Sequence, residues 1–350
     1  MFNIKETIEK IYRESLDVKS YERILIIGDS FDHEKNTLQD RKFIARCFKD
    51  VADKFGYFLK MFFYESGKIH GEEPPVTLWV ECLGRDFCNN LFKDIPYEFI
   101  KDKRVALEDL LKYKDKIDKN IFPDIVIAIS YYSTSHTLFR KFLNYLGCRY
   151  ASMPMVEKEM FAGPLNVDYN DLEKRTLMLA EKLKGYRAVG IKNNSGTDIV
   201  VNFEGTKINC DTGNLKERGS FGNLPAGEVY LAPRLKGTNG RICIEYFMGK
   251  KLIKPVFMDF KEGLVTDLTG DNEAVSQLNK ILKDERNRVI AELGFGTNRG
   301  AKNPENVLEA EKVDGTCHIA IGDNITFGGN NRATIHIDFV IFNPEFRWLS

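Results

Sequence analysis

Two polar side chains interrupt an apolar segment near the C-terminus, ATIHIDFVIF (333–342). The alternation predicts a β-strand in which His336 and Asp338 project from one face and apolar residues from the other. A neutral imidazole beside a carboxylate can bind a divalent metal ion. The same pair could instead be a core histidine hydrogen-bonded to its neighbour, and the HxD pattern alone does not decide between the two.

A second predicted strand, TCHIAIGDN (316–324), carries His318 among apolar residues. The chain has only five histidines, and two of them lie in these neighbouring apolar strands. If the strands pair, His318 can converge with His336 and Asp338, and this ligand set suits zinc, cobalt, manganese or ferrous iron. For the other three histidines, at positions 33, 70 and 136, we predict surface or structural roles.

Two glutamates extend the set of candidate ligands. Glu228 follows a Pro-Ala-Gly turn in NLPAGEVYLAP, so its carboxylate stands at the start of an apolar strand. Glu292 is predicted at the C-terminal end of a long helix, 271–293, where an acidic side chain is unfavourable with the helix dipole. Either residue could instead be solvated, the first in a turn and the second at a frayed helix end.

The elements that position these residues fall into two halves. In the first half, strand-like and helix-like segments alternate, which predicts a parallel α/β sheet. The strand-like segments are 23–29, 57–64 and 124–130, and the helix-like segments are 36–56, 133–147 and 168–185.

From Tyr186 onward, short strands are separated by Asn, Gly and Asp turns, and the helix 271–293, with Asp271 as its N-cap, interrupts them. We therefore predict an N-terminal α/β domain (1–185) and a C-terminal α+β domain (186–350) that carries the metal site.

The composition argues against several classes of protein, among them nucleic-acid-binding and membrane proteins. Lys+Arg and Asp+Glu balance at 51 each, so there is no broad positive field for nucleic acid or an acidic membrane surface. No segment approaches 18 apolar residues, and the N-terminus predicts a charged amphipathic helix rather than a signal peptide. The seven cysteines contain no CxxC pair, which predicts reduced, mostly buried thiols. We expect a cytoplasmic protein with a small-molecule or peptide substrate.

The ordered motifs NLPAGEV, AELGFGTN, CHIAIGDN and IHIDF resemble the metallo-aminopeptidase family of aminopeptidase T and aminopeptidase S, the thermophilic-type leucyl aminopeptidases. The resemblance is most specific over about residues 218–340. It implies metal ligands at Glu228, Glu292, His318, His336 and Asp338. It also implies a homodimer.

The activity implied by this resemblance is removal of N-terminal residues from peptides by a water activated between two divalent ions, zinc, cobalt or manganese. Glu228 would serve the reaction as well as bind metal. Glu311 is the nearest candidate for the general base.

The chain departs from the family pattern in three places. A family tyrosine seven residues after the strand histidine is replaced by Ile325, and Asp323 or Asn324 could supply an oxygen in its place. The acidic DEN stretch of the family becomes EAEKVDGT, which leaves Glu311 two positions out of register. The segment between His318 and His336 is also shorter than in the family.

Two alternatives stay open. His318, His336 and Asp338 form the two-histidine, one-carboxylate set of a mononuclear ferrous oxygenase, and ring-cleaving pyridine-diol dioxygenases resemble these aminopeptidases in fold. Such an enzyme would need one Fe(II), with Glu228 and Glu292 outside the ligand set. The second alternative is a degenerate member that binds a ligand without turnover.

Overall fold

The computed structural model describes residues 3–31, 37–65 and 67–350 of the chain. His33 lies outside these residues. Within the described residues, no helix is both long and apolar enough to cross a membrane. All seven cysteines are free thiols, and all but Cys210 are buried, which agrees with the predicted burial.

The chain divides into two compact units. The N-terminal unit comprises Met1–Asn166 and Gly213–Pro225, and the C-terminal unit comprises Val167–Thr212 and Ala226–Ser350. This division does not coincide with the predicted domains, because helix α8 (Tyr169–Leu183) belongs to the C-terminal unit and strand β8 (Phe221–Asn223) to the N-terminal sheet. The domain boundary at residue 186 stays a prediction.

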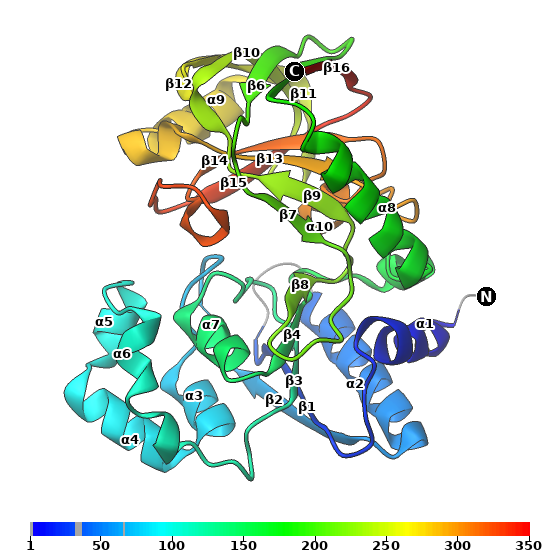
Figure 1. Ribbon diagram of the computed structural model, residues 1–350, viewed down its shortest axis with the longest axis vertical. Helices are drawn as coiled ribbons and strands as arrows, with labels where there is room; N and C mark the ends of the chain where they lie inside the picture. Colours follow the sequence, from blue (N-terminus) through cyan, green and yellow to red (C-terminus); the bar gives the residue numbers. More distant parts are fainter. Residues whose placement is uncertain (1–2, 32–36, 66) are drawn as a thin grey trace. The chain divides into compact units, whose positions relative to one another are not determined.

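Five parallel strands form the sheet of the N-terminal unit, in the order β2-β1-β3-β4-β8 (Figure 1). Their bounds are β1 (Arg23–Asp29), β2 (Phe58–Tyr64), β3 (Ile125–Ile129), β4 (Arg149–Ser152) and β8 (Phe221–Asn223). β1 and β3 lie inside the sheet and are apolar and buried, whereas β2 at the edge is partly exposed. The predicted parallel sheet alternating with helices is confirmed for this part of the chain.

Helices accompany these strands. Their bounds are α1 (Ile4–Lys10) with a π-helical turn (Ile11–Ser15), α2 (Thr37–Phe55), α3 (Val76–Leu83), α4 (Arg85–Asp94), α5 (Tyr97–Lys101), α6 (Leu107–Leu111) and α7 (Leu138–Tyr145), with 3₁₀ turns at Lys114–Lys116 and Lys158–Ala162. α2 and α7 fall within predicted helical segments, whereas α3 to α6 were not predicted. Residues of α3, α4 and α7 share one apolar cluster with β1 and β3, so these helices cover one face of the sheet.

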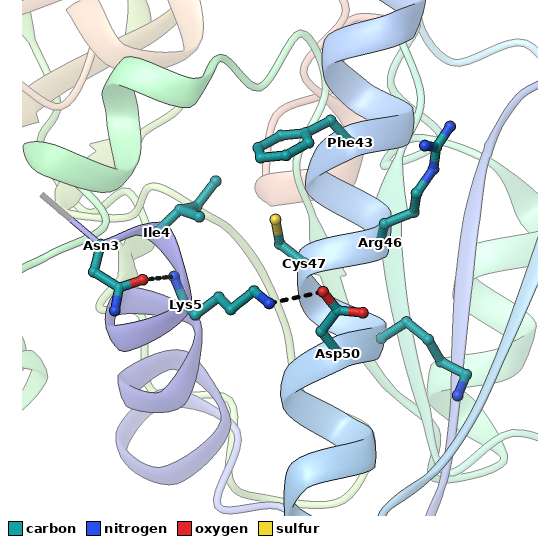
Figure 2. A pocket seen from close by; sticks show the side chains of 8 residues that line it. Asn3, Ile4, Lys5, Phe43, Arg46, Cys47 and Asp50 are labelled. Carbon is teal, nitrogen blue, oxygen red and sulfur yellow. Dashed lines mark hydrogen bonds and ion pairs between the residues drawn. The ribbon is translucent and has the colours of Figure 1, made fainter.

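α1 and α2 line a surface hollow of the N-terminal unit (Figure 2). Lys5 and Asp50 face each other across it, with Lys5 Nζ 2.8 Å from Asp50 Oδ2. None of the predicted ligands lines this hollow.

Glu73 caps helix α7 from a distant part of the chain. Its buried carboxylate accepts hydrogen bonds from the backbone amides of Leu138 and, at 3.1 Å, Phe139. These amides lie in the first turn of the helix and have no partner within it. We expect Glu73→Ala to lower the free energy of unfolding by about 1–3 kcal/mol in urea denaturation. The exposed Glu98→Ala is the control and should change it by less than about 0.5 kcal/mol; equal losses would contradict the capping role.

Two antiparallel sheets make up most of the C-terminal unit. A six-stranded sheet has the order β12-β11-β10-β6-β5-β16, and a five-stranded sheet has the order β15-β14-β13-β9-β7. The strands are β5 (Ala188–Lys192), β6 (Asp198–Asn202), β7 (Ile208–Asp211), β9 (Glu228–Leu231), β10 (Arg234–Phe247), β11 (Lys250–Lys261), β12 (Leu264–Thr269), β13 (Ile290–Gly296), β14 (Cys317–Gly322), β15 (His336–Ile341) and β16 (Glu345–Leu349).

Helices α8, α9 (Asn272–Ile281) and α10 (Val307–Ala310), with 3₁₀ turns at Glu285–Arg288 and Ile325–Phe327, complete the C-terminal unit. A single apolar cluster contains residues of both sheets, such as Ile191 and Met258 from one and Leu293 and Ile319 from the other. The sheets therefore share one core, and the α+β character predicted for this half agrees with the mixture of helices and antiparallel sheets.

The predicted helix 271–293 is wrong in its second half. Asp271 caps α9 as predicted, accepting from the amides of Glu273 and Ala274, but the helix ends at Ile281. A 3₁₀ turn follows, and residues 290–296 form β13. β13 pairs with β14 on one side and β9 on the other, and these pairings satisfy its backbone groups.

Candidate metal centre

One face of the five-stranded sheet carries all the predicted ligands. They are Glu228 at the start of β9, Glu292 on β13, His318 on β14, and His336 and Asp338 on β15. In the strand register, Gly294 lies opposite His318 and Ala320 opposite Asp338, and opposite residues project from the same face. Successive side chains of a strand point to opposite faces, so the apolar neighbours of these residues point to the other face of the sheet, where they lie in the core.

The ligand atoms form two groups. Glu228, Glu292 and His318 each offer one atom within 4.8 Å of the others, and so do Glu292, His336 and Asp338. His318 Nε2 lies 3.2 Å from Glu292 Oε1, and His336 Nε2 lies 3.4 Å from Glu292 Oε2. Glu292 therefore belongs to both groups through its two oxygens, as a carboxylate shared by two cations would.

Small residues make room for the imidazole of His318. A Cβ atom at Gly294 would stand 2.1 Å from His318 Nε2, closer than any side chain tolerates. Ala320 occupies the next position of β14 on the same face. The sheet can hold a fully buried histidine here because the residue across from it is glycine.

The loop after β14 orients His336. His336 Nδ1 lies 2.7 Å from the backbone carbonyl oxygen of Asp323, so Nδ1 donates and Nε2 faces Glu292 and Asp338. A carbonyl partner on the far nitrogen is the usual companion of a metal-binding histidine.

Asp323 belongs to neither ligand group. The Asp323 carboxylate accepts from the amide of Ala333 at 3.1 Å, and the Asn324 side chain accepts from the amide of Asn331 at 2.8 Å. Both side chains are thus hydrogen-bonded within the loop after β14. The expectation that one of them supplies an oxygen in place of the family tyrosine, at Ile325, stays a prediction.

Tyr230 lies on the same face, opposite Gly294. Burial, together with the charge of Glu228, raises the pKa of Tyr230, so its phenol stays protonated at neutral pH. Its ring contacts Phe327, which in turn contacts the imidazole of His336. Aromatic side chains therefore border the ligand groups within the C-terminal unit.

Lys312 is a component of the centre for which the sequence gives no signal, because a lysine in the polar segment EAEKVDGT is ordinarily solvated. Its side chain is fully buried, and Nζ lies 2.7 Å from Glu228 Oε1 and 2.8 Å from Glu311 Oε2. Glu311, the predicted base, thereby shares the Lys312 ammonium with Glu228, a candidate ligand. The charge of Lys312 lowers the pKa of Glu311, but burial and the negative charges of Asp338 and Glu228 have the larger effect and raise this pKa to about 7.

The carboxylates of the centre favour a positive charge beside them. Burial alone would lower the pKa of His318, but its hydrogen bond to Glu292 and the charges of Glu228 and Glu292 raise it to about 9. In the same way, Asp338 and Glu292 raise the pKa of His336 well above its ordinary value. The carboxylates therefore favour a positive charge at this place, and a metal ion bound to neutral imidazoles would supply it.

Burial alone would raise the pKa of each carboxyl, but the imidazoles hold the pKa values of Glu292 and Asp338 below their ordinary values.

One buried atom supports the fit to a metal. Glu228 Oε2 has no hydrogen-bond partner among the described residues and lies 3.6 Å from His318 Nε2. A buried carboxylate oxygen without a hydrogen bond is costly unless a cation binds it. Together with carboxylate and imidazole donors, which suit zinc, cobalt, manganese or iron, the residues present fit divalent metal ions.

Comparison with solved structures shows a shared fold. A 2,5-dihydroxypyridine dioxygenase from Pseudomonas putida KT2440 has 14% sequence identity, covers 98% of this chain and 93% of its own, and superposes with a TM-score of 0.71. Wild-type AmpT from Thermus thermophilus has 14% identity, covers 99% of this chain and 94% of its own, and superposes with a TM-score of 0.60. At such identity the likeness shows the fold alone. No curated protein matches the sequence.

The family model for thermophilic metalloproteases (M29) matches residues 166–347. The match covers more than half of the chain and contains every candidate ligand as well as Glu311 and Lys312. The resemblance to the metallo-aminopeptidases is thus confirmed at the level of the family. The chain belongs to the thermophilic metalloprotease family M29, and it is a metal-dependent peptidase.

Proposed function

We propose that the protein is an aminopeptidase that removes N-terminal residues from peptides with the help of two divalent cations, zinc, cobalt or manganese. The observation that carries this proposal is the pair of ligand groups that meet at Glu292. A shared carboxylate between two cation positions is the arrangement expected of a two-metal hydrolase.

Five residues would hold the ions. Glu228, Glu292 and His318 form one position, and Glu292, His336 and Asp338 form the other. Bound there, the cations supply Lewis-acid polarisation of the scissile carbonyl and lower the pKa of the attacking water. The apolar core behind the sheet and the loop contact at His336 Nδ1 fix the ligand side chains before substrate arrives.

Glu311 is proposed as the general base. Its side chain is 15% exposed, more than that of Glu228, so it can reach both solvent and the edge of the ligand groups. Lys312 holds one of its oxygens and leaves the other for a proton taken from the attacking water. Glu228 contributes to the reaction as a ligand whose position fixes one cation.

Peptide hydrolysis by the metal-loaded protein tests the proposal. Protein stripped with a chelator and reloaded with zinc, cobalt or manganese should release the first residue from amino-acid anilides and short peptides that have a free amino terminus. The same peptides with an acetylated terminus should resist, because an aminopeptidase requires the free amine. Failure to cleave any free-amino substrate with any of the three metals would overturn the proposal.

The second candidate is a one-iron ring-cleaving dioxygenase, favoured by the high structural similarity to the Pseudomonas enzyme. Its ligands would be His318, His336 and Asp338. In the structure, however, His318 groups with Glu228 and Glu292 rather than with His336 and Asp338. Oxygen uptake with a pyridine-diol by protein loaded anaerobically with Fe(II), in the absence of peptide cleavage, would favour this candidate.

We also propose a cytoplasmic homodimer. The family resemblance supports the dimer, and the seven free thiols are compatible with a reducing compartment. Sedimentation velocity should give the mass of two chains.

A further inference from the structure

Lys312 brings a permanent positive charge into the candidate centre. Its ammonium is fully buried and is held between Glu228 Oε1 and Glu311 Oε2, at 2.7 and 2.8 Å. None of the ligand roles proposed above uses this charge. A buried ammonium must nevertheless affect any cation that binds beside it.

The backbone fixes the place of this ammonium. The Lys312 amide donates to the carbonyl oxygen of Glu309 at 3.0 Å, and the Lys312 carbonyl accepts from the amide of Asn298 at 2.8 Å. β13 packs directly against the same segment, since a Cβ at Gly296 would stand 2.1 Å from the carbonyl oxygen of Val313. The lysine is therefore anchored to the strand that carries Glu292.

This anchoring determines how Glu228 can bind a cation. Oε1 is already paired with the ammonium, whereas Oε2 is buried, lacks a hydrogen-bond partner within the described parts of the chain, and lies 3.6 Å from His318 Nε2. Glu228 can thus offer a single oxygen, and its negative charge is partly neutralised by Lys312.

The two ligand groups consequently differ in effective charge. Glu292 is common to both, so the difference lies in the second carboxylate. Glu228 shares the Lys312 ammonium with Glu311, whereas Asp338 lies 3.3 Å from an imidazole, His336, which becomes neutral when it binds metal. Cation affinity rises with the negative charge of the ligands, so the group containing Asp338 should bind more tightly.

We propose that Lys312 is a positioning residue that makes the two cation positions unequal. The ion at Glu228, Glu292 and His318 binds about tenfold or more weakly than the ion at Glu292, His336 and Asp338. This inference rests on the two-ion centre proposed above. Its consequence is that the weaker position fills last, so the supply of metal in the cell controls how much of the protein carries both ions.

Calorimetric titration of the metal-free protein with Zn²⁺ tests the inference without any substrate. The native protein should show two classes of binding. Asp338→Asn should remove the tight class, and Glu228→Gln the weak class. Lys312→Met should tighten the weak class by about tenfold, while Lys312→Arg should keep the native difference. Lys192→Met, at an exposed ion pair with Asp198 in the same unit, is the matched control and should change neither class.

Two outcomes would overturn the inference: two equivalent ions in the native protein, or a Lys312→Met variant in which the ratio of the two affinities is unchanged or larger. If Lys312→Met does not fold, Lys312→Gln removes the same positive charge, keeps a hydrogen-bond donor, and permits the same comparison.

The titration also separates this inference from the proposed function. Two unequal ions without peptide cleavage would refute the aminopeptidase and leave the role of Lys312 standing. Two equivalent ions together with peptide cleavage would refute the role of Lys312 and support the aminopeptidase.

Discussion

Replacing Glu292 by glutamine is expected to remove both metal ions and to lower kcat/KM for a free-amino peptide by about 10³-fold or more. Glu292 is the only residue common to the two ligand groups found in the described chain, and each of its oxygens faces a different histidine. A neutral amide cannot balance the charge of either cation. Elemental analysis after equilibrium dialysis, together with steady-state kinetics, measures both effects.

Glu345→Gln is the matched control for this variant. Glu345 is an exposed residue of β16 in the same unit, opposite Lys192 and outside the ligand groups. It should retain the native metal content and activity. If Glu292→Gln also kept two ions and a kcat/KM within about tenfold of the native value, Glu292 would not be the shared ligand.

The second large effect is expected from Gly294→Ala, which adds one methyl group to the sheet face beneath His318. The new Cβ would stand 2.1 Å from the imidazole, and the ring, buried in the sheet, has no room to retreat. We expect the free energy of unfolding to fall by about 1–3 kcal/mol. We also expect the affinity for the ion held by His318 to fall by about 10–100-fold, because the imidazole is displaced from Glu228 and Glu292.

Gly190→Ala on β5 controls for the substitution of a strand glycine. A Cβ at Gly190 would meet only ordinary contacts, the nearest being Arg347 Nε at 3.5 Å. Thermal unfolding and zinc titration should show little change for this variant. An equal loss of metal affinity in both variants would mean that the glycine at position 294 has no particular relation to His318.

The sequence predicts strands β1, β2 and β3 of the parallel sheet, and β1 and β3 are clearest because they are apolar runs, a pattern that depends on local composition alone. It misses β4 and β8, which have only four and three residues. It fails at residues 282–293 because helix and strand preferences are similar there, and the outcome depends on pairing with β9 and β14, which are distant in sequence. The helices α5 and α6, with five residues each, are too short to establish a clear period.

For the site, residue types and order are sufficient to identify the candidate ligands, since histidines and acidic residues within apolar strands are costly without a partner. The sequence cannot indicate that Lys312 pairs with Glu228, because the two are far apart along the chain and a loop lysine is normally solvated. It also cannot indicate the importance of Gly294, which becomes evident only when the strand register places it opposite His318.

The most direct test of the central claim is the number of metal ions per chain at saturation, measured by equilibrium dialysis against zinc followed by elemental analysis. The two ligand groups that meet at Glu292 predict two ions per native chain and fewer than one per Glu292→Gln chain. A native protein that saturates with a single ion would contradict the two-ion centre.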